Sequence, residues 1–159
     1  LATNVSSTFT YNSVKTTLSL GNSITVKEYI SYLSNSYLFF ELSKFDFSLR
    51  KSLNSPKKIY IIDTAFNNVT GFNFSPNAGK NLENVFFIEL RRRKNEIYYF
   101  AEKNECDFII KEGTKINKAI QVCYDLNKEN KDREIKGLLE ALEKFKLKEG
   151  LIITFDQEE

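Results

Sequence analysis

The chain has 159 residues, of which 42% are hydrophobic, and this is enough for one domain or two small ones with a packed core. Its 23 basic and 21 acidic side chains give a formal net charge of +2, which neither requires nor excludes a nucleic-acid partner. Histidine is absent and there are two cysteines, so Ser-His-Asp and Cys-His catalytic systems, histidine-ligated metals and a disulfide framework are excluded. Any metal ion must therefore be held by oxygen ligands.

The chain begins with Leu1 and contains no methionine, so we expect it to be an excised part of a longer protein. Its first residues lack the basic, apolar and small-residue pattern of a signal peptide. No apolar run approaches the roughly 18 residues that a membrane span needs. We therefore expect a cytoplasmic protein without a membrane partner.

Two helices are predicted near the N-terminus. Apolar side chains between Phe9 and Leu20 indicate a modest helix that stops at Gly21. Thr25 and Glu28 have the spacing of a capping box, which predicts the start of a second helix there. Apolar residues then follow at helical spacing: Val26, Tyr29, Ile30 and Leu33.

Two strand-like runs follow these helices, over 37–42 and 58–62. The polar and basic stretch between them, 44–57, is predicted to form a hairpin. Helix, helix, strand, basic hairpin and strand is a winged-helix pattern, which we assign to 1–63. A high density of turn-forming residues then predicts a linker over 64–79.

The remainder, 80–159, predicts an α/β (α+β) domain with the element order αβββαβ. The spacing of Leu82, Val85, Phe86 and Leu90 predicts the first helix, and that of Ile135, Leu138, Leu139, Leu142 and Phe145 predicts the second. The first two strands are expected to form a hairpin. The predicted ranges are 80–94 for the first helix, 96–101, 106–111 and 118–126 for the strands, 130–145 for the second helix and 151–155 for the last strand.

Acidic and amide side chains fall at notable places in this domain. Asp107 interrupts an otherwise apolar strand, where an unpaired carboxylate costs several kcal/mol. Glu83 lies on the first helix, one position from its apolar stripe, which leaves a plain surface carboxylate as an alternative. Gln121 and Cys123 share one side of the third strand. Asp107 and Glu83 are candidate Mg²⁺ or Mn²⁺ ligands, and Gln121 could add a carbonyl oxygen.

Several segments together resemble the C-terminal region of archaeal-type AAA+ ATPases. The resemblance covers most of the chain, over 58–63, 82–92, 105–110, 121–126, 133–139 and 148–154. It implies a P-loop ATPase module, then a winged-helix element, then a domain of the restriction-endonuclease-like, PD-(D/E)XK-type fold. No Gly-x-x-x-x-Gly-Lys-Ser/Thr segment occurs in this chain, so ATP binding is expected only in an upstream domain of the same protein.

The resemblance also implies a nuclease site, from which this sequence departs. Active members of the wider superfamily carry Asp and then Glu-x-Lys. Asp107 matches the first, and Glu83 matches the helix glutamate, but Gln121-Val122-Cys123 stands where Glu-x-Lys is expected. The implied catalytic residues are Asp107, Glu83 and Gln121, with Asp107 and Glu83 as metal ligands.

Clusters of basic residues are the candidates for contacts with DNA or RNA. Arg50, Lys51, Lys57 and Lys58 flank the predicted wing, where phosphate contacts would occur. Arg91, Arg92 and Arg93 end the first helix of the second domain, and their alternative role is to complement its dipole.

Three functions remain open on the sequence alone, of which a winged-helix transcription regulator ranks last, because the second helix lacks the basic residues of a recognition helix. The first is a nucleic-acid-binding domain with weak or lost metal-dependent phosphodiesterase activity. The second is a catalytically inactive domain that mediates self-association or partner binding for the ATPase. The loss of Glu-x-Lys is the sequence feature that favours the second.

Overall fold

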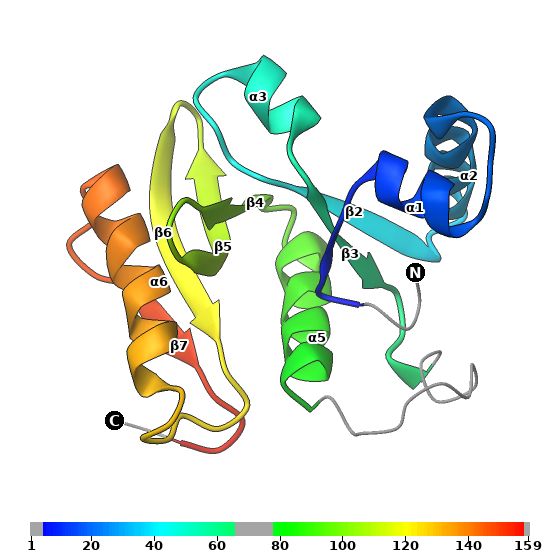
Figure 1. The fold of residues 1–159 in the computed structure, drawn as a ribbon. Helices are drawn as coiled ribbons and strands as arrows, with labels where there is room; N and C mark the ends of the chain where they lie inside the picture. The colour runs from blue at the N-terminus through cyan, green and yellow to red at the C-terminus, as the bar shows by residue number, and fades with distance from the viewer. Residues whose placement is uncertain (1–4, 66–77, 158–159) are drawn as a thin grey trace. The chain divides into compact units, whose positions relative to one another are not determined.

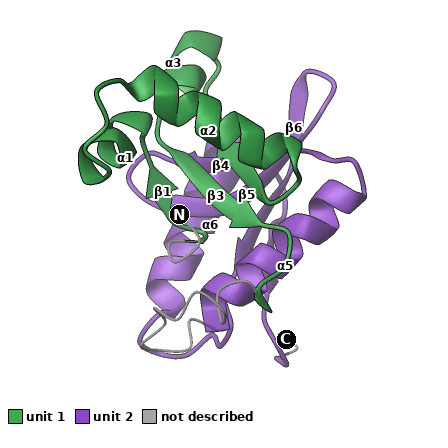
Figure 2. Cartoon of the chain, turned by 90° about the vertical axis from the view of Figure 1, so that its right-hand side faces the viewer, with its two compact units in different colours: residues 1–75 green, residues 76–159 purple. Residues whose placement is uncertain are grey.

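The computed structural model describes residues 5–65 and 78–157. The fold is mixed α and β, as predicted, and the chain divides into two compact units, Leu1–Ser75 and Pro76–Glu159 (Figure 2). Most of the predicted linker, 64–79, lies outside the described residues, although its last two residues belong to a helix. Within the described ranges, no helix combines the length and apolar character that crossing a membrane requires.

The first unit contains a small antiparallel sheet whose described strands run in the order β1-β3-β2 (Figure 1). Its core includes a cluster of Val5, Phe39, Ile59 and Ile61, against which Phe9 and Leu33 pack. The elements in chain order are β1 (Thr8–Phe9), α1 (Tyr11–Thr17), α2 (Ser23–Asn35), β2 (Phe39–Ser43), α3 (Leu49–Asn54) and β3 (Lys57–Ile61).

The start of α2 differs from the prediction. The helix begins at Ser23, and the Asn22 side chain accepts a hydrogen bond of 2.9 Å from the Ile24 backbone N–H. Asn is among the best N-cap residues, so it fixes the helix start ahead of Thr25. The capping box predicted at Thr25 and Glu28 is therefore wrong.

The connection between β2 and β3 also differs, because helix α3 occupies the place of the predicted basic hairpin. The buried Ser52 hydroxyl of α3 donates a 2.6 Å hydrogen bond to the Lys44 carbonyl, just beyond β2. This bond ties the short helix back to the sheet. The strands on either side still pair antiparallel.

The second unit has the predicted order αβββαβ. In its sheet β4-β5-β6-β7 the first three strands are antiparallel and β7 runs parallel to β6. In Figure 1 this sheet lies between two helices. The elements are α5 (Ala78–Arg92), β4 (Glu96–Ala101), β5 (Glu105–Glu112), β6 (Lys115–Val122), α6 (Lys131–Phe145) and β7 (Leu151–Ile153).

Each helix of this unit buries one carboxylate side chain on the face that packs against the sheet. The apolar stripes predicted from the sequence do not include these carboxylates. In α5 the buried side chains are Glu83, Asn84, Phe87 and Leu90, and in α6 the buried residues are Glu134, Gly137, Leu138 and Ala141. Val85 and Leu139, which were predicted to face the core, are exposed. Each buried face is thus rotated from its predicted stripe, and a polar group on that face requires a partner.

Gly137 allows α6 to approach the sheet closely. A Cβ atom at this position would lie 1.9 Å from the Glu105 carbonyl oxygen, which is a backbone atom of β5. Because the clashing atom belongs to the backbone and not to a flexible side chain, any side chain at 137 would push α6 away from β5. A glycine is required here by space.

We therefore predict that Gly137→Ala destabilises the protein by about 1–3 kcal/mol, the usual cost of overpacking. Urea unfolding followed by circular dichroism measures this difference. Gly79→Ala is the matched control, because nothing lies within 4 Å of its Cβ position in α5, and it should be neutral or stabilising by up to about 1 kcal/mol. Equal stability of Gly137→Ala and the wild type would contradict the close packing of α6.

Candidate functional site

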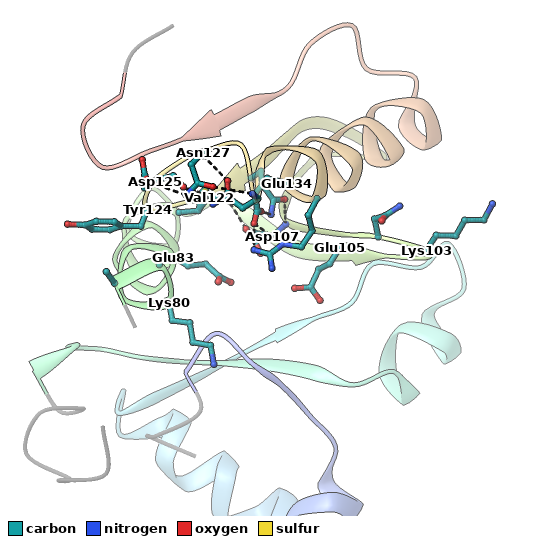
Figure 3. A pocket seen from close by; sticks show the side chains of 17 residues that line it. Lys80, Glu83, Lys103, Glu105, Asp107, Val122, Tyr124, Asp125, Asn127 and Glu134 are labelled. Carbon is teal, nitrogen blue, oxygen red and sulfur yellow. Dashed lines mark hydrogen bonds and ion pairs between the residues drawn. The ribbon is translucent and has the colours of Figure 1, made fainter. Parts of the chain in front are cut away.

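A cavity of about 780 Å³ lies within the second unit, where the ends of β5 and β6 meet the first turns of α5 and α6 (Figure 3). Carboxylates outnumber cations among the described residues that line it. The five carboxylates belong to Glu83, Glu105, Asp107, Asp125 and Glu134, and the three cations belong to Lys80, Lys103 and Arg133.

Asp107 is held against the neighbouring strand. Its Oδ2 accepts a 3.0 Å hydrogen bond from the Val122 backbone N–H, and its own N–H donates to Gln121 Oε1 at 3.3 Å. The residue is only 6% exposed. This backbone donor stabilises the Asp107 carboxylate and fixes its orientation. It therefore offsets part of the energetic cost of burial that the sequence predicts for this residue.

Gln121 connects this strand pair to α6. Its Nε2 donates a 2.6 Å hydrogen bond to Glu134 Oε2, while its Oε1 accepts from the Asp107 backbone. A neutral amide can donate to one partner and accept from the other. A glutamate at this position could only accept, and it would place a second carboxylate against Glu134.

Glu134 and Arg133 are site residues that the sequence prediction missed. Glu134 is 6% exposed, and its Oε1 accepts from Arg133 Nε at 3.1 Å and from Arg133 Nη2. This hydrogen-bonded pairing raises the pKa of Arg133, whose side chain is 78% exposed at the cavity rim. The available signal was helical spacing, because Glu134 shares one face of α6 with Leu138 and Ala141.

The structure brings together the three predicted catalytic residues. Glu83, Asp107 and Gln121 all line the cavity, and Glu83 is buried, so the alternative of a surface carboxylate is wrong for this residue. Cys123 lines it too, and its Sγ contacts the Asp125 carbonyl at 3.1 Å. Burial raises the pKa of the Cys123 thiol, and the nearby charge of Glu134 adds to the effect.

Oxygen atoms suitable for Mg²⁺ are present in the cavity. The carboxylates of Glu83 and Asp107 and the carbonyl of Gln121 belong to the ligand types that this ion prefers. Over residues 5–65 and 78–157, no group of three or more His, Cys, Asp or Glu side chains is arranged to hold a metal ion. A magnesium ion here would thus complete its shell with water or phosphate oxygens, as Mg²⁺ commonly does.

Cations at the cavity differ in their orientation. In Figure 3 the side chains of Lys80 and Lys103 extend away from the carboxylates of Glu83 and Asp107. Arg133, in contrast, is bonded into the cluster through Glu134. Arg133 is therefore a cation that is directly bonded to a buried carboxylate of the cavity.

The basic residues predicted to bind nucleic acid fall into two groups. Lys57 and Lys58 are buried in β3, so their expected display beside a wing is wrong, and burial lowers the pKa of Lys57. The others are exposed, on α3 or at the end of α5: Arg50, Lys51, Arg91, Arg92 and Arg93. None of the predicted basic residues is among the described lining of the cavity.

Arg92 and Arg93 share a local partner on α5, Glu89. Glu89 accepts hydrogen bonds from Arg92 Nε at 2.7 Å and from Arg93 Nε at 2.6 Å. These bonds lower the pKa of Glu89 to about 2. Arg92 and Arg93 thus form exposed pairs within the last turns of α5, where positive charge also complements the helix dipole.

Comparisons with known proteins place the chain among uncharacterised relatives. Residues 1–75 match a family described as Domain of unknown function (DUF8612). The chain is 41% identical over 140 residues to an uncharacterised protein of Methanocaldococcus jannaschii, a match that covers 84% of this chain and 30% of the relative. It is 27% identical over 103 residues to an uncharacterised protein of Haemophilus influenzae, covering 64% and 26%. The chain thus spans less than a third of either relative. No solved structure gives a significant match.

The two hydrogen bonds of the Gln121 side chain, to the Asp107 backbone and to Glu134, allow a prediction for Gln121→Glu. This change places two buried carboxylates in contact and removes the amide donor, so it should lower the free energy of unfolding by about 1–3 kcal/mol in EDTA. Urea unfolding measures the change. Asn12→Asp adds the same charge at an exposed position and should stay within about 0.5 kcal/mol of the wild type. A Gln121→Glu variant as stable as Asn12→Asp would show that these two hydrogen bonds contribute little.

Proposed function

We propose that the second unit is a restriction-endonuclease-like domain that binds nucleic-acid phosphates at its cavity together with Mg²⁺ or Mn²⁺. The order αβββαβ and the sheet β4-β5-β6-β7, with its parallel last pair, support this fold. The proposal includes the wider assignment to the C-terminal region of an archaeal-type AAA+ ATPase, which rests on the sequence resemblance.

The observation that carries this proposal is the excess of carboxylates in the cavity. Glu83, Asp107 and Glu134 are all buried, and two further carboxylates share the lining. Concentrated negative charge is costly unless a cation offsets it, and it repels phosphate. A divalent cation would remove both difficulties, because it would offset the charge of the carboxylates and attract a phosphate.

The proposed chemistry is metal-assisted hydrolysis of a phosphodiester. The metal ion would polarise the phosphoryl group and lower the pKa of a bound water molecule. Glu83 and Asp107 would hold the ion, Gln121 orients Asp107 and Glu134 through its two hydrogen bonds, and Arg133 would offer a positive charge to the phosphate. Hydrolysis is expected to be slow, because Gln121 and Cys123 supply neither the anionic ligand nor the cation of a Glu-x-Lys motif.

The first unit fits a winged-helix-like segment in this proposal. Its paired helices α1 and α2 and its sheet β1-β3-β2 support the assignment. Exposed Arg50 and Lys51 on α3 are its candidate phosphate contacts. The exposed side chains of Ile24, Tyr29 and Tyr32 on α2 are better suited to packing on protein, such as the upstream ATPase domain, than to reading bases.

Labelled oligonucleotides test the role of the cavity. In Mg²⁺ or Mn²⁺ the wild-type chain should bind and slowly cut them, and EDTA should abolish both activities. Asp107→Asn keeps the size of the side chain and an acceptor for the Val122 N–H but removes the charge, so we expect cleavage to be lost and Mg²⁺-dependent affinity to fall at least about tenfold. Fluorescence anisotropy and a denaturing gel measure binding and cleavage separately.

Asp132→Asn is the matched control, because Asp132 is exposed in the first turn of α6 and is not part of the described lining. It should behave as the wild type in both assays. Binding and cleavage by Asp107→Asn at wild-type levels would refute the metal site. Binding without any cleavage by the wild type would keep the nucleic-acid function and remove the catalytic one.

A second candidate function is an inactive domain for self-association or partner binding. It is favoured by the internal bonding of the cluster: both oxygens of Glu134, both amide atoms of Gln121 and Oδ2 of Asp107 already have partners. Such a network can serve structure alone. If no oligonucleotide binds, this function predicts concentration-dependent dimers in sedimentation velocity, and a monomer at every concentration would oppose self-association.

A further inference from the structure

Two aromatic side chains stack beside the cavity. Tyr124 follows β6 and Phe155 follows β7, and their ring centroids lie 4.9 Å apart with an interplanar angle of 17°. The backbone fixes this arrangement, because Cys123 N–H donates to the Ile153 carbonyl at 2.9 Å and Phe155 N–H donates to the Tyr124 carbonyl at 3.2 Å. The pairing of β6 and β7 therefore continues past the strands and sets the two rings side by side.

This pair lies at the surface instead of in the core. Phe155 is 62% exposed and Tyr124 is 39% exposed. Tyr124 also lines the cavity, and in Figure 3 its ring extends to the side, away from Asp107. An ordered aromatic stack is thus presented to solvent directly at the edge of a charged cavity.

We propose that Tyr124 and Phe155 form a stacking platform for an unpaired base of single-stranded nucleic acid whose phosphate enters the cavity. This inference rests on the proposed function and specifies its substrate class. Every base has a flat π-face, so stacking on aromatic side chains is strong and tolerant of sequence. Bases in a duplex are already stacked on their neighbours, so the platform favours single strands.

The neighbourhood of the rings argues for a nucleotide as the occupant. The cavity side offers Arg133 and the carboxylates proposed to hold a divalent cation, while the outer side offers the two ring faces. A ligand that matches both must be anionic at one end and flat and aromatic at the other. A nucleotide unit within a single strand has both parts, joined through a sugar.

The test compares binding of labelled single-stranded DNA and RNA with binding of the same DNA strand carrying abasic sites, which keeps the phosphates and removes the bases. In Mg²⁺, Phe155→Ala should weaken binding of the intact strands about 5- to 100-fold, the range for the loss of one stacked base. On the abasic strand, Phe155→Ala and the wild type should bind equally. Fluorescence anisotropy gives the dissociation constants, and a denaturing gel verifies that the probes stay intact.

Two further variants separate stacking from other effects. Phe155→Leu keeps apolar bulk without a ring and should resemble Phe155→Ala. Tyr32→Ala removes an exposed aromatic of α2 in the first unit and should leave binding unchanged. Circular dichroism checks that each variant is folded.

The outcomes distinguish the platform from the cavity. Mg²⁺-dependent binding that Phe155→Ala leaves unchanged would overturn the platform and keep the proposed function. An equal loss on duplex and single strands, or on the abasic strand, would overturn selection of an unpaired base. Failure of the wild type to bind any oligonucleotide would overturn the proposed function and this inference with it.

Discussion

The hydrogen bonds of the Gln121 amide join three of the four elements that form the cavity, β6, β5 and α6. Through its oxygen the amide holds the backbone of β5 at Asp107, and through its nitrogen it holds Glu134 of α6. The amide thus bonds directly to the Glu134 carboxylate and to the backbone of Asp107, whose own carboxylate accepts from the Val122 N–H. A side chain that both donates and accepts is needed for this role, and Gln or Asn supplies it where Glu cannot. The residue at which the sequence departs from the Glu-x-Lys pattern of the resemblance is thus the one that organises the polar cluster.

This cluster also depends on how closely α6 approaches the sheet. Gly137 lies one turn after Glu134, and its missing side chain lets the helix backbone rest on the Glu105 carbonyl. Leu138 and Ala141 bury the same face of the helix. Close apolar packing along α6 therefore positions a carboxylate at its first turn, where the backbone N–H groups of a helix N-terminus favour negative charge. Packing and electrostatics act here in the same direction.

The sequence predicted most helices and strands of the second unit correctly. It did not predict which polar side chains are buried between them. The periodicity of 96–101 and 130–145 gave β4 and α6 almost to the residue, because alternation and helical spacing are strong local signals. Asp107 stood out because a carboxylate inside an apolar strand needs a partner. Glu134 did not, because the predicted stripe of α6 was rotated by one position and left it outside. Helix α3 was missed because it has only 6 residues, too few for a clear helical repeat, although Ser48 caps it locally and Ser52 bonds to the Lys44 carbonyl.

Under the proposed function, other charged residues of the cavity compensate for the missing Glu-x-Lys motif. Replacing Glu-x-Lys by Gln121-Val122-Cys123 removes one negative and one positive side chain, so the net charge of that strand segment is unchanged. Arg133 and Glu134 are adjacent on α6 and bring one group of each sign to the same cavity. Under the proposed function, the helix thus supplies the carboxylate and the cation that the strand lacks. Because Arg133 is exposed and its partner is buried, a phosphate can compete for the guanidinium while Glu134 stays bound to Gln121. Under the proposed function, Arg133 therefore contacts a ligand while the cluster that positions it stays intact.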